Sequence, residues 1–512
     1  MTSEASVFQD LFVERAEKDQ LAQWKQTVVD HSLVNQAISP FFHWLSGFVP
    51  DGVAPSLLTL CGSAALIQSW YFCANGAEGQ ALLTHGTAIL SISLFWVLGS
   101  LDVKTADRIA GDTPVAELFR YVCGLVCAPF IVSMVCTLVC QRACPETHWY
   151  LVQTMQMLLF LKHYSAFKRE VALSYSWVGP GELLAGALGL LLISVMFGQT
   201  VVQSAAGITF GLVLSPLQNY VAPSSVDAIT AHAVAKAACM AVFALTLLVL
   251  AGSRKSRPHG WTRTGLSAAF VLRAVAAMVR FASLGRVAST PNDAIFDALF
   301  IAMMTADIIV AKMSGRGMHT WIVPMALMVL LPQWQSLTVV FCSFYIIATF
   351  CDLVMHTNLP LFQVVTNVYC DGIYDLCHMG HKNAFERALR HGNRLFVGVV
   401  GDEDANNYKR PPIMSALERE REVFKCKGVT KVIQNAPCFG LTEEFIKKHN
   451  IHVVCFGREY LERYSKPEDD PYYKVPRQMG IAVPVDRYSD MSTTDIIQRI
   501  LARGSDSKKS PT

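Results

Sequence analysis

Two closely spaced histidines, His378 and His381, lie in the stretch "YCDGIYDLCHMGHKNAF", residues 369–385, just after an apolar run and an Asp-Gly turn. Imidazoles beside a helix N-terminus suit a polyanion, because ring N–H groups, backbone amides and the helix dipole all favour phosphate. Preorganised donors of this kind also stabilise the charge on a phosphoryl group during its transfer. Metal ligation is less favoured, since no third Cys, His or carboxylate stands at metal spacing. Two unrelated surface histidines are the alternative interpretation.

Strands and helices alternate around the two histidines. The expected order indicates a parallel sheet with right-handed crossovers, which is a Rossmann-like α/β domain. Ligands of such sheets bind beyond the carboxyl ends of the strands, where both histidines are expected to lie. We predict strands up to residue 370 and at 394–400, 429–434, 452–456 and 481–486, and helices at 380–391, 415–426, 441–449 and from 493 onward.

The composition before this domain is that of a membrane protein. Only 16% of the 512 residues are charged and 52% are hydrophobic, whereas an ordinary soluble domain has about 25% charged residues. We expect a helical N-terminal region (1–40), an all-α polytopic membrane domain (41–358), a linker (359–366), the α/β domain (367–503) and a disordered tail (504–512). A spanning helix needs about 20 apolar residues. Candidate spans lie at 55–74, 81–101, 115–140, 147–162, 181–199, 228–252, 265–287, 293–312, 319–331 and 336–356.

Basic loops predict the orientation of these ten spans. The stretches 162–170 and 253–263 carry several Lys and Arg residues and are expected to face the cytosol. Both do so only if 202–220, which glycines and a proline interrupt, makes no full span. Both termini and the α/β domain are then cytosolic. Residues 1–40 show helical spacing of apolar side chains, which fits an amphipathic helix either on the membrane surface or packed on the protein.

Several classes of function are disfavoured by the composition. The net charge of +3 and the lack of a Lys/Arg stripe argue against nucleic-acid binding. The 15 cysteines form no CxxC pair, so neither a zinc site nor a disulfide framework is indicated. Charged residues such as Arg273, Arg280, Asp297 and Asp307 stand within or beside expected spans, where they are either functional or internally paired.

Two further motifs follow the histidines. With "VYCDGIYDLCHMGH", the stretches "YKRPPIMSALERERE" (408–422) and "RYSDMSTTDIIQRI" (487–500) closely resemble the cytidylyltransferases that make CDP-choline and CDP-ethanolamine, of the HxGH nucleotidyltransferase superfamily. The resemblance covers residues 367–501. It implies that the phosphate of a phospho-alcohol attacks the α-phosphate of CTP and that pyrophosphate leaves. Mg²⁺ is expected with CTP, held mostly by substrate oxygens, and no protein metal ligand is implied.

The resemblance also implies roles for individual residues. The catalytic residues would be His378, His381 and Lys409. CTP would be held by Gly372, Arg487, Ser492, Thr493 and Thr494. The head group would be bound by Asp371, Phe456, Tyr460 and Tyr473.

The head group itself stays open between choline and ethanolamine. Cys438 and Phe456 replace a tryptophan and a histidine of the choline enzymes that this chain resembles. A quaternary ammonium needs aromatic faces and a nearby carboxylate, because it donates no hydrogen bonds. The aromatic residues and Asp371 therefore favour phosphocholine. The stretch "GDEDANNYKRPP" is closer to the ethanolamine enzymes.

A second resemblance lies in the membrane domain. The stretch "SLDVKTADRIAGDTPVAELFRYVCG" (100–124) resembles the signature of the CDP-alcohol phosphotransferases, whose four aspartates hold divalent metals. Only Asp102 remains here, and the other three positions are Gly99, Arg120 and Gly124. One carboxylate beside a cationic side chain cannot hold two hard cations. The sequence therefore predicts a phosphotransferase-like domain without its chemistry.

The leading hypothesis is a membrane-anchored CTP:phosphocholine cytidylyltransferase that serves phosphatidylcholine synthesis. The alternatives are the phosphoethanolamine enzyme, a bifunctional enzyme that also transfers the head group to diacylglycerol, and a non-enzymatic membrane scaffold. Expected partners are CTP, the phospho-alcohol, membrane lipids and a second copy of the chain. The resemblances imply the endoplasmic reticulum as the membrane. Because the domain is already tethered, activity is expected not to depend on added anionic lipid.

Overall fold

The computed structural model consists of two compact units. The first is Met1–Arg108 with Asp112–Thr357, and the second is Asn358–Thr512 with Ile109–Gly111. We call them the helical unit and the α/β unit. The described residues are 12–22, 24, 29–50, 52–75, 81–109, 113–139, 145–169, 173–175, 179–198, 226–252, 260–288, 291–328, 335–357, 361–408, 410–486 and 492–506.

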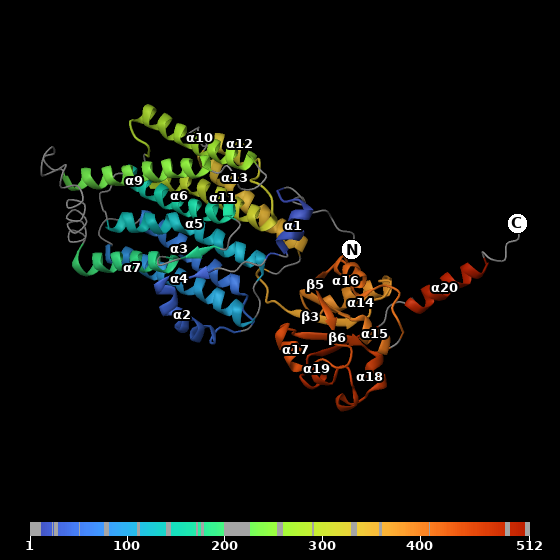
Figure 1. The fold of residues 1–512 in the computed structure, drawn as a ribbon. Coiled ribbons are helices and arrows are strands. Elements are labelled where there is room, and N and C mark those ends of the chain that lie inside the picture. Colours follow the sequence, from blue (N-terminus) through green and yellow to red (C-terminus); the bar gives the residue numbers. More distant parts are fainter. Residues whose placement is uncertain are drawn as a thin grey trace, which may run out of the picture. The chain divides into compact units, whose positions relative to one another are not determined.

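The helical unit is a bundle of long apolar helices around a central one (Figure 1). Helix α11 packs against α5, α6 and α13, and 89% of its apolar window is buried. The described elements are α1 (Arg15–Ala22), β1 (Val29–Asp30), α2 (Leu33–Ser46), α3 (Pro55–Asn75), α4 (Ala81–Arg108), α5 (Pro114–Val139), α6 (Pro145–Arg169), β2 (Ser174–Tyr175), α7 (Pro180–Phe197), α9 (Val226–Ala251), α10 (Gly260–Leu284), α11 (Pro291–Ser314), α12 (Ile322–Met328) and α13 (Gln335–Thr357).

Eight helices in the described residues are long and apolar enough to cross a membrane: α3, α4, α5, α7, α9, α10, α11 and α13. The other two expected spans fall on α6 and α12. Helix α6 is 25 residues long but buries polar side chains such as Gln153 and Gln156, and α12 has 7 residues. The apolar helices fit a membrane-associated protein, and the count of ten spans stays a prediction.

Three of the four charged residues expected within or beside spans, Arg280, Asp297 and Asp307, are paired with an opposite charge. Arg280 donates two hydrogen bonds to Asp297, at 2.9 and 2.8 Å, and Trp149 donates a third at 2.7 Å. Asp307 accepts a hydrogen bond of 2.6 Å from Arg316. Since an unpaired charge is costly among apolar helices, internal pairing accounts for these three residues, whereas the buried Arg273 donates a hydrogen bond to the Gln153 side chain.

The N-terminal region differs from the single amphipathic helix expected over 1–40. Helix α1 has only eight residues. The chain then forms the short strand β1, which pairs in parallel with β2, and continues into α2. Lys18 of α1 is fully buried, with its Nζ 2.6 Å from Asp352 of α13. Phe8, Leu11 and Val28 of the expected apolar stripe lie outside the described residues. Helix α1 therefore packs on the protein, whereas α2 leaves Leu33, Phe41 and Trp44 exposed.

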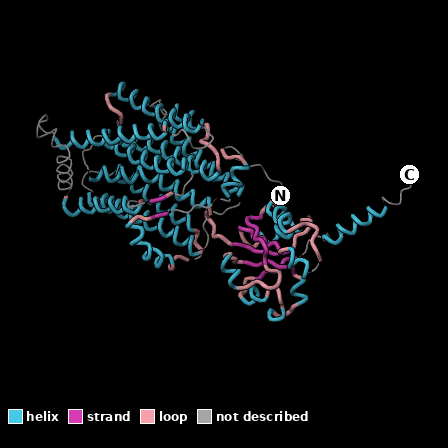
Figure 2. The backbone as a smooth tube through the Cα atoms, viewed as in Figure 1, coloured by secondary structure: helices cyan, strands magenta, loops and turns pink. Residues whose placement is uncertain are grey.

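The α/β unit is a five-stranded parallel sheet in the order β5-β4-β3-β6-β7 (Figure 2). Strand β3 is central, and the chain crosses from one side of it to the other, so ligands are expected where β3 and β6 end. Its elements are β3 (Asn367–Gly372), α14 (Met379–Leu389), β4 (Arg394–Val400), α15 (Asp402–Tyr408), α16 (Ala416–Phe424), β5 (Val429–Ala436), α17 (Glu443–Lys448), β6 (Val453–Gly457), α18 (Glu459–Arg463), η4 (Pro467–Asp469), α19 (Lys474–Gln478), β7 (Ala482–Val485) and α20 (Thr493–Asp506).

The parallel sheet and its long helices agree with the sequence prediction. All five expected strands form, and the four expected helices correspond to α14, α16, α17 and α20. The short helices α15, α18 and α19 were not expected, because five to seven residues carry too little periodicity. Helix α20 also continues to Asp506, past the expected domain end at 503.

Candidate functional site

The loop after β3 carries both histidines. His378 is the N-cap of α14, and its Nδ1 accepts a hydrogen bond of 3.1 Å from Gly380 N. An accepting Nδ1 places the proton of the neutral ring on Nε2. The rings of His378 and His381 stack with 4.0 Å between centroids, and His381 packs edge-on against Tyr374 at 5.2 Å. The two imidazoles thus form one surface at a helix start, where an anion is favoured.

The start of α20 meets this loop. Ser492 caps the helix, since its Oγ accepts from Asp495 N at 3.2 Å and its N–H donates to the Asp495 carboxylate at 2.8 Å. Thr493 serves a different purpose. Its Oγ1 donates to Asp375 O at 3.1 Å and lies 3.4 Å from His378 Nε2. Residues 115 positions apart in sequence therefore converge, and the start of α20 joins that of α14 at one edge of the sheet.

Asp375 and Arg419 fix the surrounding loops, and neither was expected as a site residue. The buried Asp375 carboxylate accepts from Ile413 N and Met414 N, each at 3.1 Å. Arg419 of α16 is fully buried and donates to Ile373 O at 2.6 Å. Asp375 lies between β3 and the histidines in the sequence, and this position could have identified it as a residue near the site. Arg419 looks like an ordinary charge of an amphipathic helix and left no signal.

The histidine loop has an unusual backbone. Tyr374 and Leu376 both have left-handed conformations, with φ of 55° and 52°. Side chains other than glycine seldom adopt this region, at a cost of about 1–3 kcal/mol each. Gly372 precedes them at the end of β3, where an added Cβ would lie 3.0 Å from the Tyr374 ring. The buried network of Asp375 and Arg419 holds this shape in place.

The four expected head-group residues also come together. Tyr473 donates a hydrogen bond of 2.8 Å to Asp371 Oδ1. The Tyr473 ring stacks on Phe456 at 4.9 Å and meets the edge of Tyr460 at 5.1 Å. Strands β3 and β6 pair Tyr369 with Val454, so Asp371 lies level with Phe456 where both strands end. One carboxylate is therefore set among three aromatic rings at the carboxyl edge of the sheet.

Further aromatic residues extend this cluster beyond what the sequence predicted. The hydroxyls of Tyr408 and Tyr460 are 3.0 Å apart. The Tyr472 ring packs edge-on against Tyr408 at 5.7 Å and against Tyr460 at 5.4 Å. Phe439 lies 6.2 Å from both Tyr408 and Tyr472. The run "DDPYYK" contained the signal for Tyr472, because it places two tyrosines side by side.

The Asp371 carboxyl titrates near neutral pH. Burial raises its pKa from 3.8 to about 6, and the hydrogen bond from Tyr473 partly offsets this rise. Perturbed carboxyl groups of this kind mark functional sites more often than chance. At pH 7 and above the group is mostly ionised and presents a negative charge to the aromatic cluster.

The remaining residues expected to bind CTP or to act in catalysis are Lys409, Arg487 and Thr494. Lys409 and Arg487 lie outside the described residues. Thr494 is exposed on α20, one residue beyond Thr493. Among the residues that the structure describes, no group of three His, Cys, Asp or Glu side chains is arranged to hold a metal ion.

The residues of the expected phosphotransferase site lie on α4 and α5. Asp102 is fully buried and accepts hydrogen bonds from Arg120 at 3.1 Å and Thr59 at 2.5 Å. Gly99 and Gly124 leave open space, because a Cβ added at either meets no atom within 4 Å. The Asp102 carboxylate is neutralised by Arg120, and the other three positions of the expected metal site carry no carboxylate.

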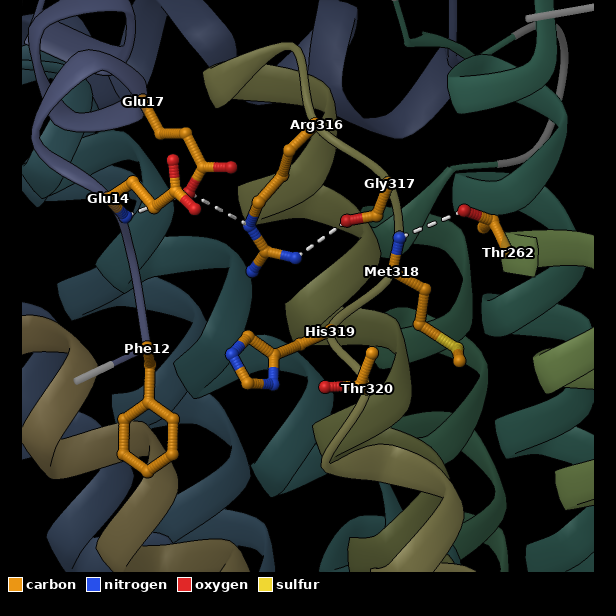
Figure 3. A pocket seen from close by; sticks show the side chains of 9 residues that line it. All are labelled: Phe12, Glu14, Glu17, Thr262, Arg316, Gly317, Met318, His319 and Thr320. Atoms are coloured by element: carbon orange, nitrogen blue, oxygen red, sulfur yellow. Dashed lines mark hydrogen bonds and ion pairs between the residues drawn. The ribbon is translucent and has the colours of Figure 1, made fainter. Parts of the chain in front are cut away.

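A separate cavity lies in the helical unit between the N-terminal segment and the loop after α11 (Figure 3). Its volume is about 290 Å³. Arg316 dominates it but is already bound to Asp307 at 2.6 Å and to Gly317 O at 2.7 Å. None of the expected site residues lines it. The lining residues are Phe12, Glu14, Glu17, Thr262, Arg316, Gly317, Met318, His319 and Thr320.

Comparison with known proteins bears on the α/β unit. Residues 369–499 match the family model described as cytidylyltransferase-like. Choline-phosphate cytidylyltransferase A of Rattus norvegicus is 39% identical over 136 residues, which cover 26% of this chain and 36% of that protein. Ethanolamine-phosphate cytidylyltransferase of Dictyostelium discoideum is 35% identical over 136 residues, covering 26% and 37%. Choline-phosphate cytidylyltransferase 2 of Arabidopsis thaliana is 38% identical over 136 residues, covering 26% and 44%.

This chain spans between a third and a half of the length of these relatives. Relatives named for choline and for ethanolamine match at similar identity, so the comparison does not separate the two head groups. The matched segment contains the histidine loop, the aromatic cluster and the start of α20. The α/β unit is a cytidylyltransferase-like domain, similar to the choline-phosphate and ethanolamine-phosphate enzymes.

Proposed function

We propose that this chain is a membrane-anchored CTP:phosphocholine cytidylyltransferase, which makes CDP-choline and pyrophosphate. The observation that carries the proposal is the contact of Thr493 with both His378 and Asp375. This contact brings the stretch around His378 and the stretch around Thr493 together at the edge of the sheet where Asp371 and its aromatic neighbours also lie. The similarity of residues 369–499 to choline-phosphate and ethanolamine-phosphate cytidylyltransferases supports the same activity.

The proposed reaction is an in-line displacement at the α-phosphorus of CTP. A phosphate oxygen of phosphocholine forms the new bond to phosphorus, and the bond to pyrophosphate breaks. The Nε2–H of His378, shared between Thr493 Oγ1 and the substrate, and the stacked His381 ring donate to the oxygens on which charge develops. Thr493 orients the His378 ring, while the amides at the start of α20 face the triphosphate. No covalent protein intermediate is needed, since positioning and electrostatics suffice.

Lys409 and Arg487 are proposed to neutralise phosphate oxygens of CTP, with Ser492 and Thr494 near them. Mg²⁺ would enter with CTP and offset the charge of its phosphates. Gly372 would leave room for the nucleotide beside β3.

The head-group site favours choline on physical grounds. Asp371 supplies a negative charge, and Phe456, Tyr460 and Tyr473 supply aromatic faces around it. A trimethylammonium group is bound by charge and by ring faces, each worth about 0.5–2 kcal/mol. A primary ammonium would instead require about three hydrogen-bond acceptors, which in this cluster would be Asp371 and tyrosine hydroxyls, while the ring faces would contribute less. Phosphoethanolamine is the second candidate.

The helical unit is proposed to anchor the enzyme without transferring the head group to lipid. The Arg120–Asp102 pair leaves no ionised carboxylate free for metal binding at that position. We further propose that the anchoring membrane is the endoplasmic reticulum, that the α/β unit faces the cytosol and that the chain forms homodimers.

Product analysis of the purified full-length protein tests the main proposal. CTP is supplied with phosphocholine or phosphoethanolamine in parallel, and the nucleotide products are identified by mass. We expect CDP-choline as the preferred product. The His378→Ala variant is expected to lose at least about a hundredfold in kcat. His391→Ala is the matched control, because His391 is exposed at the end of α14 and outside the site.

Each alternative has its own signature in this assay. Preferred formation of CDP-ethanolamine would reverse the head-group assignment. Formation of phosphatidylcholine from CDP-choline and diacylglycerol would show a bifunctional enzyme. If the native protein and His378→Ala both fail to turn over CTP, the result would favour a non-enzymatic membrane scaffold.

A further inference from the structure

Two thiols touch directly behind the histidine loop. Cys377 Sγ lies 3.6 Å from Cys426 Sγ, although the residues are 49 positions apart in sequence. Cys377 immediately precedes His378, and Cys426 follows the C-terminal end of α16. Both side chains are half-buried. The α/β unit has three other cysteines, Cys370, Cys438 and Cys455, and in its described residues none of these contacts another Sγ.

We propose that Cys377 and Cys426 form a reversible disulfide that switches off the nucleotidyl-transfer site. This inference concerns regulation of that site and therefore rests on the proposed function. The oxidant we name is a low-molecular-weight disulfide. Cys426 sulfur attacks it and releases one small thiol, and Cys377 sulfur then attacks Cys426 and releases the second. Two electrons pass from the protein thiols to the small disulfide, and the two thiol protons end on the released thiols.

Cys426 is the sulfur that reacts first. Burial and the neighbouring Cys426 raise the pKa of Cys377 to about 12, so Cys377 stays a thiol at neutral pH. Cys426, half-buried like Cys377, donates its S–H to Glu422 O, 3.3 Å away. The initial mixed disulfide is thus expected at Cys426, with Cys377 as the resolving group.

Bond formation requires a movement that falls on the histidine loop. An S–S bond is about 2.05 Å long, so the two sulfurs must approach by about 1.5 Å. Cys426 is held through α16, whose Arg419 is buried and bound to the carbonyls of Ile373 and Val400. Cys377 belongs to the histidine loop, whose two left-handed residues are already strained, so any shift on the Cys377 side of the new bond distorts that loop. The displacement is then passed to His378 through one peptide bond.

A shift of this size is large for the contacts of His378. The ring lies 3.4 Å from Thr493 Oγ1 and accepts from Gly380 N at 3.1 Å. A misplacement of about 1 Å in a catalytic group can reduce the rate about a hundredfold. We expect the oxidised protein to lose about ten- to a hundredfold in kcat, and the loss to be restored by a reducing dithiol.

The test uses the full-length protein in detergent, equilibrated with mixtures of reduced and oxidised glutathione. Samples are acid-quenched, alkylated and digested, and the peptide linking Cys377 to Cys426 is quantified by mass. CDP-alcohol formation is measured on the same samples. The expected result is that the fraction linked and the fraction of activity lost rise together. Cys426→Ser is expected to keep the reduced activity and to lose its sensitivity to oxidised glutathione.

Cys438→Ser is the matched control, since it removes another half-buried thiol of the same unit and should leave the linked peptide unchanged. Absence of the linked peptide in excess oxidised glutathione would overturn the inference. So would a fully linked protein with undiminished activity, or equal inhibition of Cys426→Ser. If the reduced protein makes no CDP-alcohol at all, the proposed function fails instead, and the linked peptide still reports whether the disulfide forms.

Discussion

The hydroxyl of Tyr473 donates a hydrogen bond of 2.8 Å to Asp371 Oδ1, across 102 positions of sequence. The bond joins the end of the central strand β3 to the start of α19, and it sets a carboxylate against a stacked pair of rings. The same carboxyl group has a pKa near 6 because it is buried. A group that loses solvation in the folded protein and is nevertheless kept ionised at neutral pH is expected to serve binding rather than stability.

Replacing Asp371 by Asn should therefore stabilise the α/β unit at neutral pH. The folded-state pKa of about 6 exceeds the unfolded value of 3.8, so ionisation on raising the pH through 6 costs stability. This penalty is at most about 3 kcal/mol above pH 7 and vanishes below pH 4. Hydrogen exchange of the β3 amides in the full-length protein measures it. We expect Asp371→Asn to be more stable than the native protein at pH 7.5 and equally stable at pH 4. A less stable variant at pH 7.5 would contradict the prediction.

The same carboxyl group predicts a pH dependence of substrate affinity. Below pH 6 Asp371 becomes protonated and no longer balances the ammonium charge, so KM for phosphocholine should rise as the pH falls from 7.5 to 5. The phosphate of the substrate also titrates near pH 6. Asp371→Asn separates the two effects, since its KM should be high throughout, by about tenfold or more at pH 7.5, and should retain only the dependence due to the substrate. Identical pH profiles of KM in the two proteins would exclude a role for Asp371.

The contact between Thr493 and His378 predicts a specific catalytic loss. Thr493→Val removes the hydroxyl that binds Asp375 O and lies beside His378 Nε2 while keeping the shape of the side chain. We expect kcat to fall about tenfold or more, because the ring loses its orientation. Thr493→Ser keeps the hydroxyl and should recover most of the rate. If Thr493 served only to stabilise the start of α20, both variants would remain nearly as active as the native protein, because Ser492 already caps that helix.

The ion pair in the helical unit predicts a stability effect that is separate from catalysis. Arg120→Leu leaves Asp102 buried without its cation, and loss of one partner of a buried pair costs about 3–5 kcal/mol. The double variant Asp102→Asn with Arg120→Leu removes both charges and should recover most of the thermal stability in detergent. CTP turnover by whichever variants stay folded should be unchanged. A double variant no more stable than Arg120→Leu would show that the pair is not the cause.

Local sequence patterns were sufficient for much of the architecture. The alternation of apolar runs with helical periodicity predicted all five strands of the sheet and the four longer helices, because side-chain period depends on neighbours in sequence. Composition alone separated the apolar helices from the α/β unit. The histidine pair was recognisable from its spacing after an expected strand, which is a local property, whereas Asp371 and the hydroxyls at 492–494 were predicted through the resemblance of their motifs to known cytidylyltransferases.

Only the tertiary structure decided which of these groups meet. The contacts of Thr493 with Asp375, of Tyr473 with Asp371 and of Cys377 with Cys426 join segments 118, 102 and 49 positions apart. Arg419 became recognisable as the support of the histidine loop only through its burial, since its local surroundings resemble a solvated helix. The pKa of Asp371 and the neutralisation of Asp102 by Arg120 likewise arise from neighbours that folding supplies. Spacing along the chain determines the kinds of element and their chemical groups, whereas strand order and side-chain burial determine which groups act together.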